Sequence, residues 1–170
     1  MKKCILKIAT TLDGFIASKD NSRDWSLKAV EIDNDFESFY DSIDTIVMGR
    51  KTFDEVKERT PEVFKEKNVF VITHYLRQQD KNVTFIHENI PQEIRKMKKG
   101  KGGNIWIMGG AQLVNILIKE NLIDEAIITT IPESLGEGIR LFADDNPSCE
   151  LKLIDVKDKK GLIQAHYKVK

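Results

Sequence analysis

Apolar residues along this chain follow two kinds of spacing, which alternate from one end of the chain to the other. In residues 43–48 and 68–73, apolar and β-branched residues follow one another directly, as in buried strands. Elsewhere they recur every three or four positions, as in an amphipathic helix, and Phe36, Phe39 and Tyr40 are one such set. The predicted strands span residues 2–9, 15–17, 43–48, 68–73, 83–86, 105–108, 124–131, 151–156 and 163–169, and the predicted helices span 33–42, 52–58, 91–99 and 111–119.

The order of these elements predicts an α/β fold. Strands that alternate with helices favour a mostly parallel sheet covered by helices. The last two strands flank a turn at residues 158–161, which predicts an antiparallel hairpin at one edge. Residues 132–147, which include Gly136 and Gly138, are expected to form a long loop. No repeat or linker interrupts the pattern, so we expect residues 1–170 to form a single domain.

Composition and charge exclude several classes of function. The formal net charge is zero, so nothing draws the whole molecule toward nucleic acid or an anionic membrane. The basic run at residues 95–101 is interpreted as the solvated end of a helix. No apolar run reaches the roughly 18 residues of a membrane span. Lys7 interrupts the apolar start of the chain and no cleavage site of small residues follows, so we expect a cytoplasmic protein.

Two glycine turns are the main candidates for a binding site. Gly49 follows one predicted strand and leads into Arg50, Lys51 and Thr52, and the pair at residues 109–110 follows another strand and leads into a helix. Each turn alone fits either an ordinary strand-to-helix connection or a site where backbone amides bind phosphate. Because the carboxyl ends of parallel strands share one edge of a sheet, both turns together indicate a ligand with several phosphates, such as a dinucleotide.

For each of three further residues, the sequence allows two interpretations, a ligand-binding role and a structural one. Asp33, on the predicted helix 33–42, is placed either to bind a ring N–H and an amino group or only to favour the start of that helix, as neighbouring Glu31 and Asp35 would. Trp25 either covers a bound ring or anchors a polar loop in the core. His74 is either a ligand for a 2′-phosphate or adenine, or an ordinary surface residue.

Several familiar chemistries are absent from the sequence. The chain contains no G-x-x-x-x-G-K-[ST] loop, no G-x-S-x-G elbow and no H-x-E with P-C-x-x-C pair. The three-glycine spacing of a standard Rossmann fingerprint is also missing. The two cysteines form no paired motif, and no metal site is predicted.

Six segments occur along the chain in a distinctive order: residues 9–17 (ATTLDGFIA), 24–25 (DW), 48–53 (MGRKTF), 71–73 (VIT), 108–110 (MGG) and 135–142 (LGEGIRLF). In this order they resemble the dihydrofolate reductase superfamily over nearly the whole chain. The match is closest to the branch that includes the reductase domain of bifunctional riboflavin-biosynthesis enzymes, the RibD C-terminal domain. Asp24 stands where dihydrofolate reductases usually have a proline, and the interval from Trp25 to Asp33 is longer than theirs. No deaminase domain is present in these residues, as in branch members that stand alone.

The resemblance implies a three-layer, dihydrofolate-reductase-like fold with an eight-stranded, mostly parallel sheet, and NADPH as the cofactor. Asp33 would bind substrate as the catalytic-site carboxylate, or a neighbour such as Glu31 would, and Trp25 would border the substrate. The implied cofactor residues are Ala9 and Ile16 at the nicotinamide, Gly49, Arg50, Lys51 and Thr52 at the phosphates, Thr73 and His74 near the adenosine ribose, and Gly109, Gly110, Ala111, Gln112 and Leu113 at the pyrophosphate.

The function implied by the resemblance is an NADPH-dependent reductase. It would transfer a hydride to a small heterocyclic substrate, pterin-like or aminopyrimidine-like, as 5-amino-6-(5-phosphoribosylamino)uracil reductase or dihydrofolate reductase does. The alternatives are a nucleotide-binding regulatory module without turnover, and a structural protein that has lost the cofactor site. By resemblance we also expect a homodimer, with a small-molecule substrate as the other partner.

Overall fold

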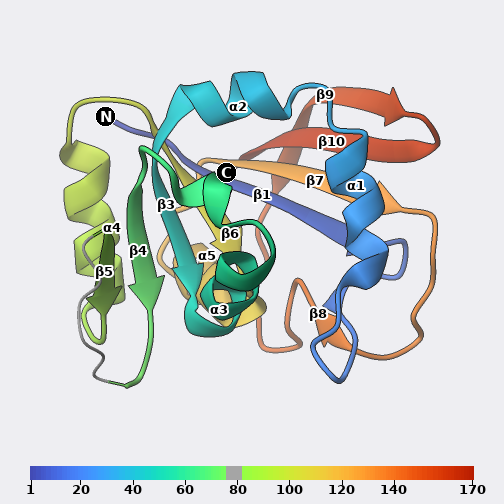
Figure 1. Cartoon of the computed structure of the whole chain (residues 1–170), viewed down its shortest axis with the longest axis horizontal. Helices are drawn as coiled ribbons and strands as arrows, with labels where there is room; N and C mark the ends of the chain where they lie inside the picture. The colour runs from blue at the N-terminus through green and yellow to red at the C-terminus, as the bar shows by residue number, and fades with distance from the viewer. Residues whose placement is uncertain (76–81) are drawn as a thin grey trace.

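An eight-stranded sheet forms the centre of the computed structural model, which describes residues 1–75 and 82–170 (Figure 1). The strand order is β5-β4-β3-β6-β1-β7-β10-β9, and β10 alone runs antiparallel to its neighbours in this sheet. A separate pair, β2 and β8, is antiparallel. The strands are β1 (Cys4–Thr11), β2 (Phe15–Ala17), β3 (Ile43–Gly49), β4 (Asn68–Ile72), β5 (Val83–Ile86), β6 (Asn104–Gly109), β7 (Glu125–Ile131), β8 (Ile139–Arg140), β9 (Leu151–Lys159) and β10 (Leu162–Val169).

Helices cover both faces of the sheet. On one face lie η1 (Asp24–Ser26), α1 (Leu27–Glu31), α2 (Phe36–Ser42), α3 (Arg50–Arg59) and η2 (Pro61–Phe64), and on the other α4 (Ile90–Lys99) and α5 (Ala111–Lys119). Figure 1 shows α2 crossing one end of the strands, with α3 and α1 nearer the opposite end. No helix in the described part of the chain is long and apolar enough to cross a membrane.

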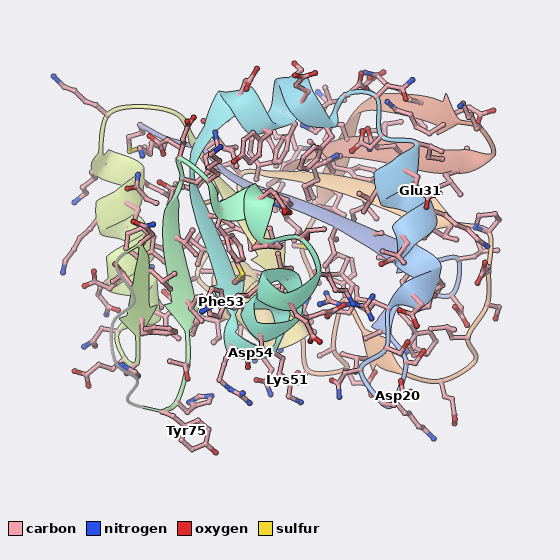
Figure 2. All side chains as sticks on the ribbon, viewed as in Figure 1. Asp20, Glu31, Lys51, Phe53, Asp54 and Tyr75 are labelled. Atoms are coloured by element: carbon pink, nitrogen blue, oxygen red, sulfur yellow. The ribbon has the colours of Figure 1, made fainter. Side chains whose placement is uncertain are left out.

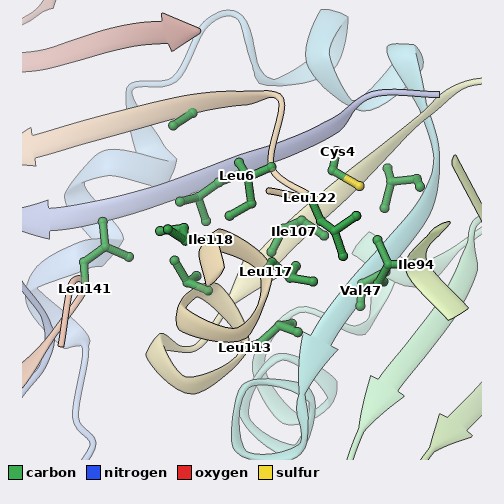
Figure 3. Close-up of a cluster of buried hydrophobic side chains, with 14 of the residues drawn as sticks. Cys4, Leu6, Val47, Ile94, Ile107, Leu113, Leu117, Ile118, Leu122 and Leu141 are labelled. Carbon is green, nitrogen blue, oxygen red and sulfur yellow. The ribbon is translucent and has the colours of Figure 1, made fainter. Parts of the chain in front are cut away.

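The two faces of the sheet carry separate cores because successive side chains of a strand point to opposite sides. On the α5 face, Val47 and Ile107 pack with Leu117, and Figure 3 shows this cluster between the helix and the strands. On the opposite face, the next residues along, Met48 and Met108, pack with Phe53 of α3. The arrangement of helices, sheet and helices confirms the predicted α/β class and its mostly parallel sheet.

The predicted helix over residues 33–42 is wrong at its beginning. The helix starts only at Phe36. A short 3₁₀ turn and α1 precede it, and neither is evident from the sequence pattern. Asp33 therefore lies in the connection between α1 and α2 rather than on a helix. The physical reason is tertiary, because the Asp33 carboxylate pairs with Lys7 in the sheet and the backbone turns to reach it.

The C-terminal hairpin is longer than predicted. β9 continues to Lys159, which pairs with Leu162, so the turn consists of Lys160 and Gly161 alone. Both turn residues have positive φ, +53° and +91°, as a tight two-residue hairpin turn requires. Residues 157–159 are all charged and lack the apolar residues of a typical strand, so the sequence pattern ends the strand too early. Within the predicted loop over residues 132–147, β8 forms a short bridge to β2.

The α5 core provides a test of the fold. Leu117 is fully buried among the residues that join α5 to the sheet. Replacing it with alanine removes apolar contacts and leaves a cavity, so we expect Leu117→Ala to lower the free energy of unfolding by about 2–5 kcal/mol. Urea denaturation measures this change. Val30→Ala, at an exposed position on α1, should stay within about 0.5 kcal/mol of the parent protein; equal losses would contradict the core assignment.

Candidate cofactor and substrate site

The two predicted glycine turns meet at one edge of the sheet. β3 and β6 are parallel neighbours, so both run into their helices at the same end. A Cβ on Gly49 would lie 3.8 Å from the Gly110 amide nitrogen, and one on Gly110 would lie 3.9 Å from the Thr52 hydroxyl. Neither α3 nor α5 has a side-chain cap, so their first-turn amides remain open to an anion.

Gly109 adds a backbone requirement to this edge. Its φ is +106°, a conformation that favours glycine, and a Cβ there would lie 3.1 Å from the Ile8 side chain. Leu113, in the first turn of α5, turns its side chain into the core, so only its backbone is available to a ligand. Ala111 is half-buried and Gln112 is exposed. These features fit a pyrophosphate that approaches the backbone closely.

Cationic side chains stand at the start of α3. Arg50 Nη1 lies 2.9 Å from the Asp54 carboxylate one turn later, and the Arg50 side chain is one-third exposed. Lys51 is exposed, whereas Thr52 is buried. In Figure 2, Lys51 lies along the same lower edge of the molecule as Tyr75, which follows the end of β4. Positive charge is therefore available beside the two turns.

The end of β4 contributes to the same edge, because Ile72 pairs with Gly49. Thr73 is buried, its amide donates to Ile86, and its hydroxyl accepts a hydrogen bond from the Tyr75 amide. The hydrogen bonds of Thr73 thus stabilise the turn that follows β4, whereas the His74 side chain is exposed. Of this predicted pair, only the His74 side chain is presented to solvent.

The two predicted nicotinamide residues face different cores. Ala9 is half-buried and packs in a cluster with Trp25, Ile131 and Leu162. Ile16 is buried in the cluster that includes α5. The predicted cofactor residues thus extend along the carboxyl edge of β4, β3, β6 and β1, with Ile16 on the adjoining β2.

The predicted substrate carboxylate has a strong partner. Asp33 Oδ2 lies 2.6 Å from Lys7 Nζ, and both side chains are about nine-tenths buried. Lys159 Nζ lies 3.8 Å from Asp33 Oδ1, while donating to Asp35 Oδ2 at 2.7 Å. Hydrogen bonds from Lys157 and Lys159 lower the pKa of Asp35 to about 2. Glu31, the alternative carboxylate, is exposed on α1 (Figure 2).

Among the residues that the structure describes, two polar atoms on this side of the sheet are buried without a hydrogen-bond partner. They are Asp33 Oδ1, an acceptor, and Trp25 Nε1, a donor. Buried polar atoms in folded proteins almost always have a partner, so orphaned ones indicate where a ligand or water binds. Trp25 packs against the same apolar cluster as Ala9, so both of its predicted roles, anchoring the loop and bordering the site, are compatible with its position.

Polar residues on the sheet surface beneath α2 are not evident as a group from the sequence. Lys7, Thr129, Gln164 and His166 come from three adjacent strands, and Gln164 donates to the Thr129 hydroxyl at 3.1 Å, with both residues buried. A pocket beneath α2 is bordered by Lys7, Phe39, Gln164 and His166, among others. The signal in the sequence is Lys7, a charged residue within the otherwise apolar run of residues 4–9.

Comparison with known proteins identifies the family. The family model for the RibD C-terminal domain matches residues 2–161. The chain belongs to the RibD C-terminal domain family. Among curated proteins, it is 43% identical to the uncharacterized protein YwjB of Bacillus subtilis strain 168, over 98% of this chain and 97% of that one.

Solved structures of the family share this fold. A Shewanella sp. PV-4 protein described as a riboflavin biosynthesis candidate has a TM-score of 0.84 at 30% identity, covering 99% of both chains. The Thermotoga maritima deaminase/5-amino-6-(5-phosphoribosylamino)uracil reductase gives 0.74 at 15%, over 98% of this chain and 56% of that one. Enterococcus faecalis dihydrofolate reductase, complexed with NADP(H), gives 0.70 at 20%, over 98% and 96%. The last two confirm the dihydrofolate-reductase-like fold.

Within this family fold, Asp13 holds together two loops beside Ile16. Its carboxylate accepts hydrogen bonds from the Thr11 and Ser134 hydroxyls and from the Leu135 and Gly136 amides. The Thr11 hydroxyl makes the largest contribution to lowering the pKa of Asp13, and the two amides and Ser134 lower it further. The turn after β1 is thereby tied to the loop that precedes β8.

The lowered pKa of Asp13 predicts a pH-dependent stability. A carboxylate whose pKa falls on folding stabilises the protein above its unfolded pKa, about 4, and this contribution disappears as the pH falls through the folded value. We therefore expect Asp13→Asn to lower the urea midpoint at pH 7 and the deficit to shrink as the pH falls below about 4. Asp20→Asn, in an exposed loop, is the control. A deficit independent of pH would refute the assignment.

Proposed function

We propose that this protein is an NADPH-dependent reductase of a small heterocyclic substrate. The observation that carries the proposal is the meeting of two uncapped helix N-termini at Gly49 and Gly110, on the sheet edge where β1 also ends. Such a pair of amide-rich turns suits a pyrophosphate better than a single phosphate. Arg50, Lys51 and His74 add cationic or titratable groups that suit an additional phosphate.

The relatives support a reductase at the level of the family. RibD and dihydrofolate reductase are both reductases, and one structural neighbour was solved with NADP(H) bound. When bound, NADPH supplies the hydride. The chain would contribute orientation: Ala9 would border the nicotinamide, and Asp33 Oδ1 and Trp25 Nε1 would hold the substrate by their unpaired acceptor and donor. Those two orphaned atoms favour a reductase over a nucleotide-binding module without turnover.

We also propose a homodimer that forms along β9. This strand lies at the edge of the sheet, pairing with β10 on its inner side. Leu153, Ile154 and Val156 on β9 are each just over half exposed. Long edge strands with exposed apolar residues favour pairing with another chain, and a second copy offers the same strand in return.

Cofactor titration tests the proposed function directly. We expect NADPH to stabilise the protein against heat and to change nicotinamide fluorescence on binding, at lower concentrations than NADH.

Gly49→Ala places a methyl group between the two turns in ordinary contact with Gly110, so the fold should persist while NADPH affinity falls at least about 10-fold, or 1.4 kcal/mol. An unchanged melting temperature without ligand is the control. Full NADPH affinity in this variant would contradict the site, and binding without oxidation by any pterin or pyrimidine would favour the regulatory alternative.

The dimer has its own test. Light scattering coupled to size exclusion should give twice the 19.5 kDa chain mass for the parent protein. Ile154→Lys places a charge on the exposed edge and should shift the mass toward that of one chain. Leu27→Lys, at an exposed apolar position on α1, should leave the mass unchanged. A parent protein that elutes at one chain mass would refute the dimer.

A further inference from the structure

Two ion pairs of opposite polarity join the segment before Trp25 to α3. Both Nε and Nη2 of Arg23 donate to Glu55 Oε2, the first over 2.9 Å. In the next pair, Arg59 Nη1 lies 2.9 Å from Asp24 Oδ1. Glu55 and Arg59 are four residues apart on α3, so they share one face of that helix. We call Arg23, Asp24, Glu55 and Arg59 the clasp.

The order of charges in the clasp favours one alignment of the segment on the helix. Arg23 precedes Asp24 along the segment, as Glu55 precedes Arg59 on α3, so each charge meets its opposite. A shift of the segment along α3 would bring Arg23 beside Arg59, and like charges placed together repel each other. The clasp therefore fixes where this segment lies along the helix.

The clasp also fixes the turn that carries Trp25. The Arg23 carbonyl accepts hydrogen bonds from the Ser26 amide at 2.8 Å and from the Ser26 hydroxyl at 2.7 Å, so Trp25 lies inside a closed turn. The Trp25 side chain packs against the same apolar cluster as Ala9, whereas α3 packs in a different cluster, and the two clusters share no described residue. Polar contacts, rather than a shared apolar cluster, thus join this turn to α3.

We propose that Arg23 and Asp24 are positioning residues that hold Trp25 beside the site by clasping α3. The proposal rests on the proposed function, because the site that Trp25 borders is that of the reductase. α3 begins next to Gly49, at the proposed phosphate site, and Glu55 lies in its second turn. A helix is a rigid element over this length, so the clasp couples the phosphate side of the site to the Trp25 side.

The exposure of the clasp suits a contact that opens and closes. The side chains of Asp24 and Arg59 are 70% and 43% exposed, so water and salt weaken their attraction. Arg23 and Glu55 are less exposed, and two N–H groups of Arg23 reach one carboxylate oxygen, so this pair is the stronger one. Surface ion pairs break and re-form readily, which lets ligands enter while Trp25 returns to one position.

Accessibility of Trp25 tests the clasp without any ligand. Acrylamide quenching of tryptophan fluorescence reports on Trp25 once the signal of the matching Trp25→Phe protein, which retains only buried Trp106, is subtracted. Arg23→Glu sets two carboxylates against each other, so the quenching constant of Trp25 should rise about 2-fold. The charge-swapped protein, Arg23→Glu with Glu55→Arg, should return to the parent value. Unchanged quenching in Arg23→Glu, or no recovery on charge swapping, would overturn the proposal.

Two ligands then separate positioning from a general role in stability. NADPH would reach the Trp25 side of the site, whereas 2′,5′-ADP carries the adenosine phosphates and lacks the nicotinamide. We expect Arg23→Glu to weaken NADPH binding about 5-fold and to leave 2′,5′-ADP binding within about 2-fold, with NADPH affinity restored in the charge-swapped protein. Equal weakening of both ligands would assign the clasp a merely structural role and refute the proposal, as would full NADPH affinity in Arg23→Glu.

Arg95→Glu is the matched control. Arg95 forms an exposed ion pair with Glu120 on the opposite face of the sheet, so its reversal should change neither Trp25 quenching nor NADPH affinity. If Arg23→Glu fails to fold, Asp24→Asn and rising sodium chloride on the parent protein weaken the same contacts, and unchanged Trp25 quenching under both would refute the clasp. Failure of both ligands to bind the parent protein would reject the proposed function, whereas Trp25 quenching would still decide the clasp.

Discussion

Parallel pairing of β3 with β6 is the constraint on which the candidate cofactor site depends. Because the two strands point the same way, Gly49 and Gly109 both reach the carboxyl edge, and the helices that follow begin side by side there. The helices then diverge, since α3 packs on one face through Phe53 and α5 on the other through Leu117. The unpaired amides of both first turns are consequently directed toward one region, although the two helices share no core.

The proposed substrate side depends on a different feature, a charged side chain inside the sheet. Lys7 occupies a strand whose other residues are apolar or small, and it is tolerated because Asp33 and Phe39 lie above it. Burying an ion pair costs desolvation, but removing one partner would leave the other charge buried and unpaired, so Lys7 and Asp33 hold each other in place.

Around this site, ion pairs and turns hold the irregular segments. Arg23 bonds to Glu55 of α3, and Asp24 pairs with Arg59 of the same helix. These contacts tie the residues before Trp25 to the helix whose first turn borders the proposed phosphate site. In the same way, hydrogen bonds from the Leu135 and Gly136 amides to Asp13 fix the loop before β8. Polar contacts thus hold these irregular segments beside the candidate site.

The sequence by itself determined the α/β class, most of the strands, the inward faces of α3 and α5, and the glycine turns, because each depends on local spacing or on backbone freedom at one residue. Tertiary structure decided where Asp33 lies, since its partner is twenty-six residues away in β1, and a helical pattern contains no information about such a contact. The same holds for Gln164 and Thr129, which meet through strand register. Side-chain periodicity shows which face is buried, whereas the identity of a partner across the sheet depends on how the strands are ordered in space.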